Sequence, residues 1–182
     1  MLNTDSMGTE ELLKVAKNEL EKRGLNYAVV ASTTGDTGLK AANIFRESSL
    51  NLVVVAHSVG FREPNVNQFY IRAKEEIEKM GGSVVFSSMP FHTINDAIRK
   101  KMGSSVLTLI ADTLRIMGQG TKVCVEIVSM ACDAGKIESG KEVVAVAGTG
   151  RGADTVLLIK SANSRRFFDL KIVEVIAKPH SF

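Results

Sequence analysis

The sequence contains no tryptophan, only three prolines and only two cysteines. Cys124 and Cys132 are eight residues apart in a helical pattern, which separates them by about 80° around the helix axis and by about 12 Å along it. A disulfide cannot span that distance, and the spacing is not that of a metal-binding motif. We therefore expect two free thiols, as is usual in a reducing cytoplasm.

Long apolar runs and an excess of one charge are also lacking. No stretch is apolar over the length that crosses a membrane, and residues 1–14 show no signal-peptide pattern. The 23 basic and 20 acidic residues leave a net charge of only +3. Basic residues cluster only at 99–101 and 165–166, without the interleaved aromatic rings that bind single strands. These features predict a cytoplasmic protein with no membrane or nucleic-acid partner.

Two widespread catalytic motifs are absent as well. The sequence contains neither the phosphate-binding GxxxxGK[ST] loop nor the GxSxG nucleophile elbow. The stretch GTGRGAD at 148–154 superficially resembles a dinucleotide-binding fingerprint, but no helical pattern follows it. Motifs of this kind therefore identify no reaction.

The patterns that are present alternate between strand and helix, which indicates an α/β fold with a mostly parallel sheet. The length of 182 residues fits one domain over 1–182. Near-continuous apolar runs, typical of strands buried on both faces, lie at 26–32, 51–58, 83–88, 141–148, 155–160 and 170–178. Helices are expected within 1–25 (starting near Thr9 and ending before Gly24), at 37–47, at 67–80, and as a three-helix excursion over 93–134. The last two strands have only short connections, so at least one of them should run antiparallel.

Glycine, hydroxyl-bearing residues, histidine and arginine are frequent directly after the predicted strands and not before them. The stretches STTGDT, HSVGFRE, SSMPFHT and GTGRGAD follow the first four strands, whereas the opposite ends carry ordinary turn residues. Because parallel sheets bind ligands outside the carboxyl ends of their strands, we expect the functional site at that edge.

The turn from Ser32 to Thr37 leads directly into a helix. Free amides, hydroxyl groups and the positive end of the helix dipole would then surround one point, an arrangement that binds phosphate. The alternative is that Asp36 or Thr37 only caps the helix. Asp36 also opposes phosphate binding, because its carboxylate repels an anion unless it is turned away.

Other candidates lie in the neighbouring loops. Arg151, in the glycine-rich loop 148–154, could close over an anion, or the loop could be a plain hairpin turn. His57 and His92 follow two strands and are either structural or catalytic, with Asp36 as the carboxylate partner of a catalytic base. Phe61 and Phe91 are either stacking surfaces for a planar ligand or parts of the core.

The helix expected at 121–135 has a narrow polar stripe. It consists of residues at i, i+4, i+7 and i+11, namely Lys122, Glu126, Ser129 and Asp133. We interpret it as a solvated seam with a Lys–Glu pair. The alternative is the polar wall of a pocket or a subunit contact.

Over about 26–178 the chain resembles the C-terminal domain of pyruvate kinase. The hydroxyl-rich turn 33–37, the strand running into Gly148–Gly152 and the stretches HSVGFRE, GQGTKVCVEI and AGTGRGADT make it most similar to stand-alone archaeal-type versions of that domain. The resemblance implies a three-layer α/β/α sandwich of about five or six strands, in the order 3-2-1-4-5 with the last strand antiparallel. It also implies a phosphate site in the loop 32–37, covered by the loop 148–154.

The stand-alone relatives resemble binders of flavin mononucleotide (FMN), whereas the domain in pyruvate kinase binds a sugar phosphate effector. Asp36 stands where the kinases commonly carry a basic residue, which disfavours a sugar bisphosphate. The catalytic barrel has no counterpart in the 182 residues, so we expect no kinase activity.

Our leading hypothesis from the sequence is an FMN-binding protein. The residues expected at the ligand are Ser32, Thr33, Thr34, Gly35, Asp36, Thr37, His57, Gly60, Phe61, Arg62, Gly148, Thr149, Gly150, Arg151 and Gly152. The competing hypotheses are a regulatory or assembly module that binds a sugar phosphate and could form a homo-oligomer, and a small flavin-dependent oxidoreductase or phosphate-ester hydrolase. An enzyme would use His57, His92 or Asp36. No metal site is expected.

Overall fold

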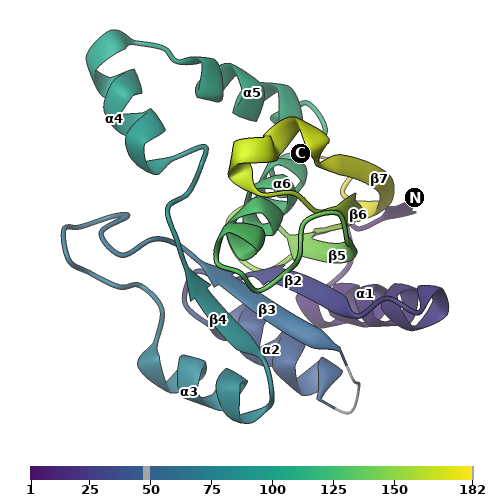
Figure 1. Ribbon diagram of the computed structural model, residues 1–182. Coiled ribbons are helices and arrows are strands. Elements are labelled where there is room, and N and C mark those ends of the chain that lie inside the picture. Colours follow the sequence, from purple (N-terminus) through teal and green to yellow (C-terminus); the bar gives the residue numbers. More distant parts are fainter. Residues whose placement is uncertain (47–49, 182) are drawn as a thin grey trace.

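The computed structural model describes residues 1–46 and 50–181. Their strands form one sheet in the order β1-β7-β6-β5-β2-β3-β4, which crosses the molecule diagonally in Figure 1. The strands are β1 (Leu2–Asn3), β2 (Tyr27–Ala31), β3 (Asn51–Ala56), β4 (Ser83–Phe86), β5 (Glu142–Ala147), β6 (Thr155–Lys160) and β7 (Lys171–Lys178).

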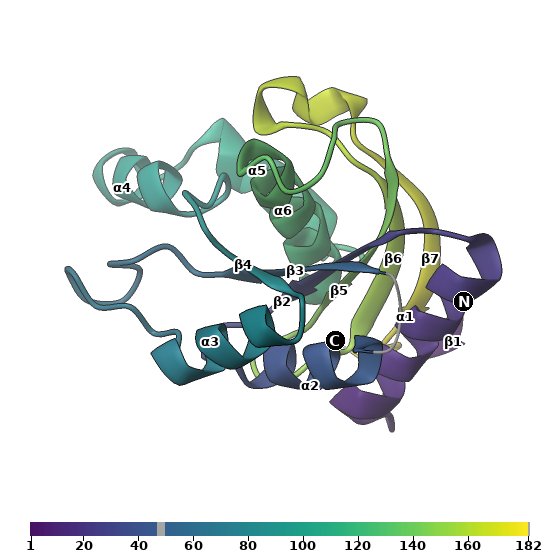
Figure 2. The same cartoon turned by 60° about the horizontal axis from the view of Figure 1, so that its bottom comes forward.

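Helices cover both faces of the sheet, which makes the three-layer sandwich that the sequence predicts (Figure 2). One layer contains α1 (Thr9–Arg23), α2 (Asp36–Phe45) and α3 (Ile71–Lys79). The other contains α4 (Thr93–Met102), α5 (Val106–Arg115), α6 (Gln119–Asp133) and the short 3₁₀ helix η1 (Ser164–Asp169). No helix in the described ranges is long and apolar enough to cross a membrane.

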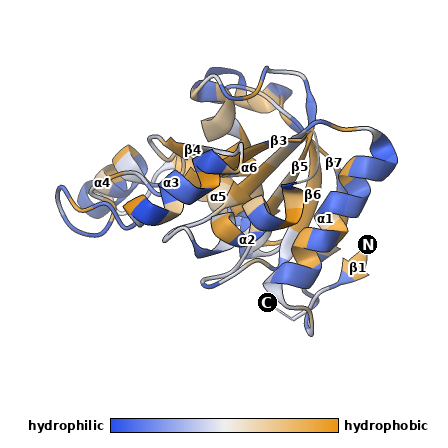
Figure 3. Ribbon diagram, turned by 90° about the horizontal axis from the view of Figure 1, so that it is seen from below, coloured by the Kyte–Doolittle hydropathy of each residue, from blue (hydrophilic) through white to orange (hydrophobic). Residues whose placement is uncertain are grey.

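The central strands are apolar on both faces because each face has its own core. Ala28 and Val30 of β2 pack with Leu12 and Leu20 of α1, while Val29, between them in sequence, packs on the opposite face with the residues of α6. Figure 3 shows the result: the central strands are mostly hydrophobic, whereas α1 is hydrophilic on its outward side. Successive side chains of a strand point to opposite faces of the sheet, so each central strand contributes residues to both cores.

The predicted strand order is confirmed for five strands and extended by two. The order 3-2-1-4-5 corresponds to β4-β3-β2-β5-β6. β6 is antiparallel to β5, as expected, but the final strand β7 is antiparallel to β6 and so points the same way as β5. The expectation that the last strand of the five-strand order is antiparallel is therefore confirmed for β6. β7 lies beyond that order, and β1 adds a seventh strand parallel to it.

Most helix limits agree with the sequence pattern. The excursion over 93–134 is three helices, broken at Gly103, which has φ +79°, and at Gly118. The helix expected at 67–80 begins later, at Ile71, because Phe69 is buried in the core ahead of the first helical turn. The loop 57–70 is consequently long and reaches the carboxyl edge of the sheet.

The first prediction concerns the contact of α6 with β6. A β-carbon on Gly120 would lie 2.5 Å from Cβ of Thr155, closer than packed atoms approach. We expect Gly120→Ala to lower the free energy of unfolding by about 1–3 kcal/mol, despite the better helix propensity of alanine. Chemical denaturation measures this. Asn18→Ala, on the exposed side of α1, should stay within about 0.5 kcal/mol of wild type. Equal stability of G120A and N18A would contradict the packing described here.

Candidate functional site

A cavity of about 660 Å³ opens at the carboxyl edge of the sheet. The loops after β2, β3, β4 and β5 all contribute to it, and α6 forms one wall from Gln119 to Met130. Its lining includes most of the residues expected from the sequence: Ser32, Thr33, Thr34, Asp36, Thr37, His57, Phe61, Arg62, His92, Gly148, Gly150, Arg151 and Gly152. Gly35, Gly60 and Thr149 lie in the same loops but do not line the cavity, and Phe91 is buried in the core beside it.

The turn between β2 and α2 is built around the buried hydroxyl of Ser32. Its Oγ accepts hydrogen bonds from the backbone amides of Gly35 and Gly38, both at 3.2 Å. Gly35 occupies the cap position of α2 with φ +109°, and a β-carbon there would lie 2.5 Å from Cβ of Ala73. The suggestion that Asp36 or Thr37 caps the helix is therefore wrong, because Ser32 supplies the capping oxygen from three residues before Gly35.

This capping leaves part of the turn unused. The backbone amides of Thr33, Thr34, Asp36 and Thr37 have no hydrogen-bond acceptor among residues 1–46 and 50–181. Those of Asp36 and Thr37 belong to the first turn of α2, which leaves such amides free, and those of Thr33 and Thr34 lie in the turn before it. The Thr34 hydroxyl donates to the Asp36 carboxylate at 2.9 Å, so the side chains left for a ligand are those of Thr33 and Thr37.

The loop 148–154 is held by its own acid and by the start of α1. The amide of Thr149 donates to Asp154 Oδ2 at 2.7 Å, and the amide of Ala153 donates to Thr9 Oγ1 at 3.1 Å. Arg151 is exposed, lines the cavity and forms no ion pair with any described residue. The same is true of Arg62 in the loop after β3. The cavity thus has two guanidinium groups available for an anion.

Three rings meet at another part of the cavity. The rings of His57 and Phe61 have centroids 4.3 Å apart, and Phe61 meets His92 edge-on at 5.6 Å. Nδ1 of His57 lies 3.2 Å from Gln68 Oε1. Burial lowers the pKa of His57, and the bond with Gln68 opposes this only in part. His57 is therefore neutral at physiological pH.

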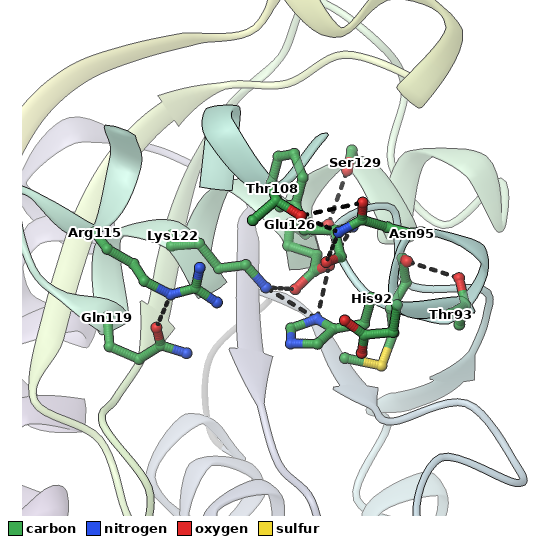
Figure 4. Close-up of polar contacts among 12 residues, drawn as sticks. His92, Thr93, Asn95, Thr108, Arg115, Gln119, Lys122, Glu126 and Ser129 are labelled. Carbon is green, nitrogen blue, oxygen red and sulfur yellow. Dashed lines mark hydrogen bonds and ion pairs between the residues drawn. The ribbon is translucent and has the colours of Figure 1, made fainter. Parts of the chain in front are cut away.

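The carboxylate partner of a histidine is Glu126 and not Asp36. Asp36 bonds with Thr34 and contacts neither histidine among the described interactions. His92 Nδ1 lies 3.4 Å from Glu126 Oε1 and 3.1 Å from Lys122 Nζ. Figure 4 shows these three side chains converging from the loop after β4 and from α6.

The polar stripe of α6 is mostly buried, so its interpretation as a solvated seam is wrong. Lys122 is 0%, Glu126 2% and Ser129 1% exposed, and only Asp133 lies at the surface. Glu126 lines the cavity, which matches the alternative of a polar pocket wall. The loop 89–93 covers the stripe, because Glu126 Oε1 accepts the backbone amide of Phe91 at 2.8 Å.

The buried groups neutralise one another. The Lys122 ammonium donates to Glu126 Oε2 and stands 5.3 Å from the centre of the Phe91 ring. Burial alone would raise the pKa of Glu126, but the bonds with His92 and Lys122 outweigh burial and lower it below the ordinary 4.5. Burial lowers the pKa of Lys122, and Glu126 opposes this. Each group therefore places an opposite charge beside the other in its buried position.

Sequence reasoning gave Glu126 and Lys122 only as the alternative of a polar pocket wall and did not count them among the expected site residues. The stripe itself was visible in the sequence, but helical periodicity does not say which loop covers a helix face. Gln68 and Gln119, which also line the cavity, had no pattern that could single them out.

No protein-family model matches the chain. Comparison with solved structures finds similarity to two crystal structures of pyruvate kinase from Cryptosporidium parvum. One covers 85% of this chain and 23% of the enzyme, at 12% identity and a TM-score of 0.44. The other covers 82% of this chain and 22% of the enzyme, at 11% identity and a TM-score of 0.39. The chain spans less than a quarter of the length of these enzymes.

The second prediction tests the buried pair. Lys122→Met leaves Glu126 buried without its cation, so we expect the free energy of unfolding to fall by about 3–5 kcal/mol. The double variant Lys122→Met/Glu126→Gln removes both charges and should recover most of that loss. Urea denaturation of the wild type, the single and the double variant measures it. A single variant as stable as the double would show that the pair is not desolvated.

The third prediction concerns acid stability. The pKa of Glu126 is lower in the folded protein than the ordinary 4.5, so its contribution to stability is complete above that value and is lost as the pH falls through the folded pKa. We expect the wild type to lose more stability between about pH 5 and pH 3 than the double variant, which has no carboxylate at this position. Identical pH dependence of the two would contradict the lowered pKa.

Proposed function

We propose that the cavity binds a phosphorylated small molecule, and that this molecule is flavin mononucleotide. The observation that carries the proposal is the set of four backbone amides at Thr33, Thr34, Asp36 and Thr37, which have no acceptor among the described residues and stand where a large cavity meets the first turn of α2. Amides in the first turn of a helix and in the turn that leads into it, beside the positive end of the helix dipole, are a common phosphate site.

The charges around this turn favour one phosphate group. Arg62 and Arg151 line the cavity without ion-pair partners in the described ranges. A guanidinium group can donate two parallel hydrogen bonds to two oxygens of one phosphate. Asp36 adds a negative charge at the same turn, which disfavours a ligand with two phosphates there. The Thr34 hydroxyl holds that carboxylate, so its charge is partly satisfied within the protein.

The remainder of the cavity suits a flat ring system. A volume of about 660 Å³ is far more than a phosphate fills and lies within the range of small-molecule sites. The aromatic rings of Phe61 and His57 line the cavity, and Met89, Met130 and Ile127 add an apolar surface. These residues fit an aromatic cofactor. If that cofactor is a flavin, it would supply redox chemistry when bound.

A sugar phosphate is the second candidate, and it would use the same amides without the rings. A competition experiment separates the two ligands, because only a ring-bearing ligand should be sensitive to Phe61→Ala. The proposal for this chain is binding, and no kinase activity is included in it.

The fourth prediction is a titration with flavins. We expect flavin fluorescence to be quenched by the protein at micromolar FMN, and riboflavin, which lacks the phosphate, to bind at least about ten-fold more weakly. Arg151→Gln should weaken FMN binding by about five-fold, as expected for an exposed charge pair, and should leave riboflavin unchanged. Asp36→Asn is a control with the opposite expected effect. It removes the charge that repels the phosphate, keeps an oxygen that accepts from Thr34, and should tighten FMN binding.

Equal affinity for FMN and riboflavin would contradict a phosphate site in this turn. Absence of any quenching at micromolar FMN would contradict the flavin assignment. Inorganic phosphate that displaces FMN would support the turn as the anion site.

A further inference from the structure

His92 stands between a buried cation and a buried anion. Its Nδ1 is 3.1 Å from Lys122 Nζ and 3.4 Å from Glu126 Oε1, while the His92 side chain is 21% exposed and lines the cavity. Figure 4 shows one ring nitrogen directed at Lys122 and Glu126, and the other directed away from both. Within the described part of the chain, this second nitrogen, Nε2, has no hydrogen-bond partner.

The hydrogen bonds of Glu126 keep the cluster in place. One carboxylate oxygen accepts the Phe91 amide at 2.8 Å and faces His92, and the other accepts the Lys122 ammonium. The residue after His92 is also constrained: Thr93 has φ +27°, a strained value for a β-branched residue, and its hydroxyl donates to the Met89 carbonyl at 2.9 Å. The ring of His92 is therefore oriented by its neighbours before any ligand arrives.

These contacts decide which ring nitrogen carries the proton. The Lys122 ammonium can only donate and lies closer to Nδ1 than the Glu126 carboxylate, which can only accept. A neutral His92 that makes the shorter contact accepts at Nδ1 and carries its proton on Nε2. If His92 is instead charged, Nδ1–H donates to Glu126 and Nε2 again carries a proton. The arrangement that would leave Nε2 bare places an N–H group against the ammonium of Lys122. Both favoured states therefore present an N–H group to the cavity.

His57 has the opposite orientation. Its Nδ1 donates to Gln68 Oε1 at 3.2 Å, so the neutral ring presents an unprotonated Nε2. His57 also lines the cavity, and Phe61 contacts both rings. One histidine thus offers a donor and the other an acceptor, and both rings contact the same phenyl ring.

We propose that His57 and His92 form a second subsite, which recognises a ring bearing both a hydrogen-bond acceptor and an N–H donor, as a cyclic amide or imide does. His92 donates to the carbonyl oxygen or ring nitrogen of the ligand, His57 accepts from its N–H group, and Lys122 and Glu126 are positioning residues that hold the proton of His92 on Nε2. With FMN as the ligand, this inference rests on the function proposed above, and its proton assignment can be tested without any ligand.

Other charged groups near the cluster do not change this assignment. Arg115, on α5, donates to Gln119 and Asp112, and Asp96, on α4, lies beside Arg99 at 3.6 Å. Arg62 is in the loop that carries Phe61. Lys122 and Glu126 are the charged groups in hydrogen-bonding contact with the His92 ring among the described residues.

The first arm of the test is nitrogen NMR of the histidine rings in the ligand-free protein at neutral pH. We expect His92 as the Nε2–H form and His57 as the Nδ1–H form. In Lys122→Met the ring of His92 loses its donor but keeps Glu126, so it should change to the Nδ1–H form. A neutral Nδ1–H His92 in the wild type would overturn the proposal, as would an unchanged His92 in a folded Lys122→Met variant. If that variant does not fold, the wild-type spectrum still decides.

The second arm measures binding. His92→Phe keeps a ring but removes the N–H group, and we expect its dissociation constant for FMN to rise by about ten-fold, as for the loss of one hydrogen bond. His92→Gln retains an N–H donor near the position of Nε2 and should stay within about three-fold of wild type. Affinity for inorganic phosphate should be the same in both variants, since the phosphate turn is untouched.

The outcomes separate the two proposals. Wild-type protein that fails to bind FMN removes the flavin assignment, while the ring spectra still test the proton assignment. If His92→Phe and His92→Gln bind FMN with equal affinity, the proposed donor subsite is wrong, whereas the proposed phosphate site is unaffected.

Discussion

The site depends on a constraint of backbone geometry at the end of β2. The strand stops at Ala31 and α2 begins at Asp36, so the first amides of the helix point out of the carboxyl edge of the sheet with no preceding turn to accept them. Ser32 accepts two of the amides in this turn, from Gly35 and Gly38. Four others remain without an acceptor among the described residues. A polar cavity at this edge follows from the order of the elements, because β2 and β5 are adjacent and their loops face the same space.

The opposite wall of the cavity has a different physical origin. Lys122 and Glu126 are buried, and such a pair is tolerated because each group supplies the charge that the other lacks. In many proteins, replacing both members of a buried ion pair with apolar residues costs little stability. In this protein the pair also positions its neighbours, since Glu126 anchors the Phe91 amide and both charged groups face His92. The Glu126 carboxylate therefore contributes both to the stability of the protein and to the position of His92 in the cavity.

Much of the fold was predictable from the sequence, and less of the site. Continuous apolar runs such as Val53–Val55 identify central strands because both faces of the sheet are covered. The two-residue strand β1 has no such pattern, and pairing with β7 alone defines it. The loops around the cavity were predictable because parallel strands end at one edge. The burial of Lys122 was not, since it depends on the loop 89–93, which is distant in sequence and folds over α6. The role of Ser32 was also hidden, because a capping serine and a ligand-binding serine look alike in sequence.

The most direct test of the central claim is an amide NMR titration of the isotope-labelled protein with FMN. If the unused amides of the β2–α2 turn bind the phosphate, the signals of Thr33, Thr34, Asp36 and Thr37 should move together and more than those of the other residues of α2, and riboflavin should not reproduce the shift. If FMN binds while these four signals stay in place, the phosphate lies elsewhere and the account of this turn is wrong.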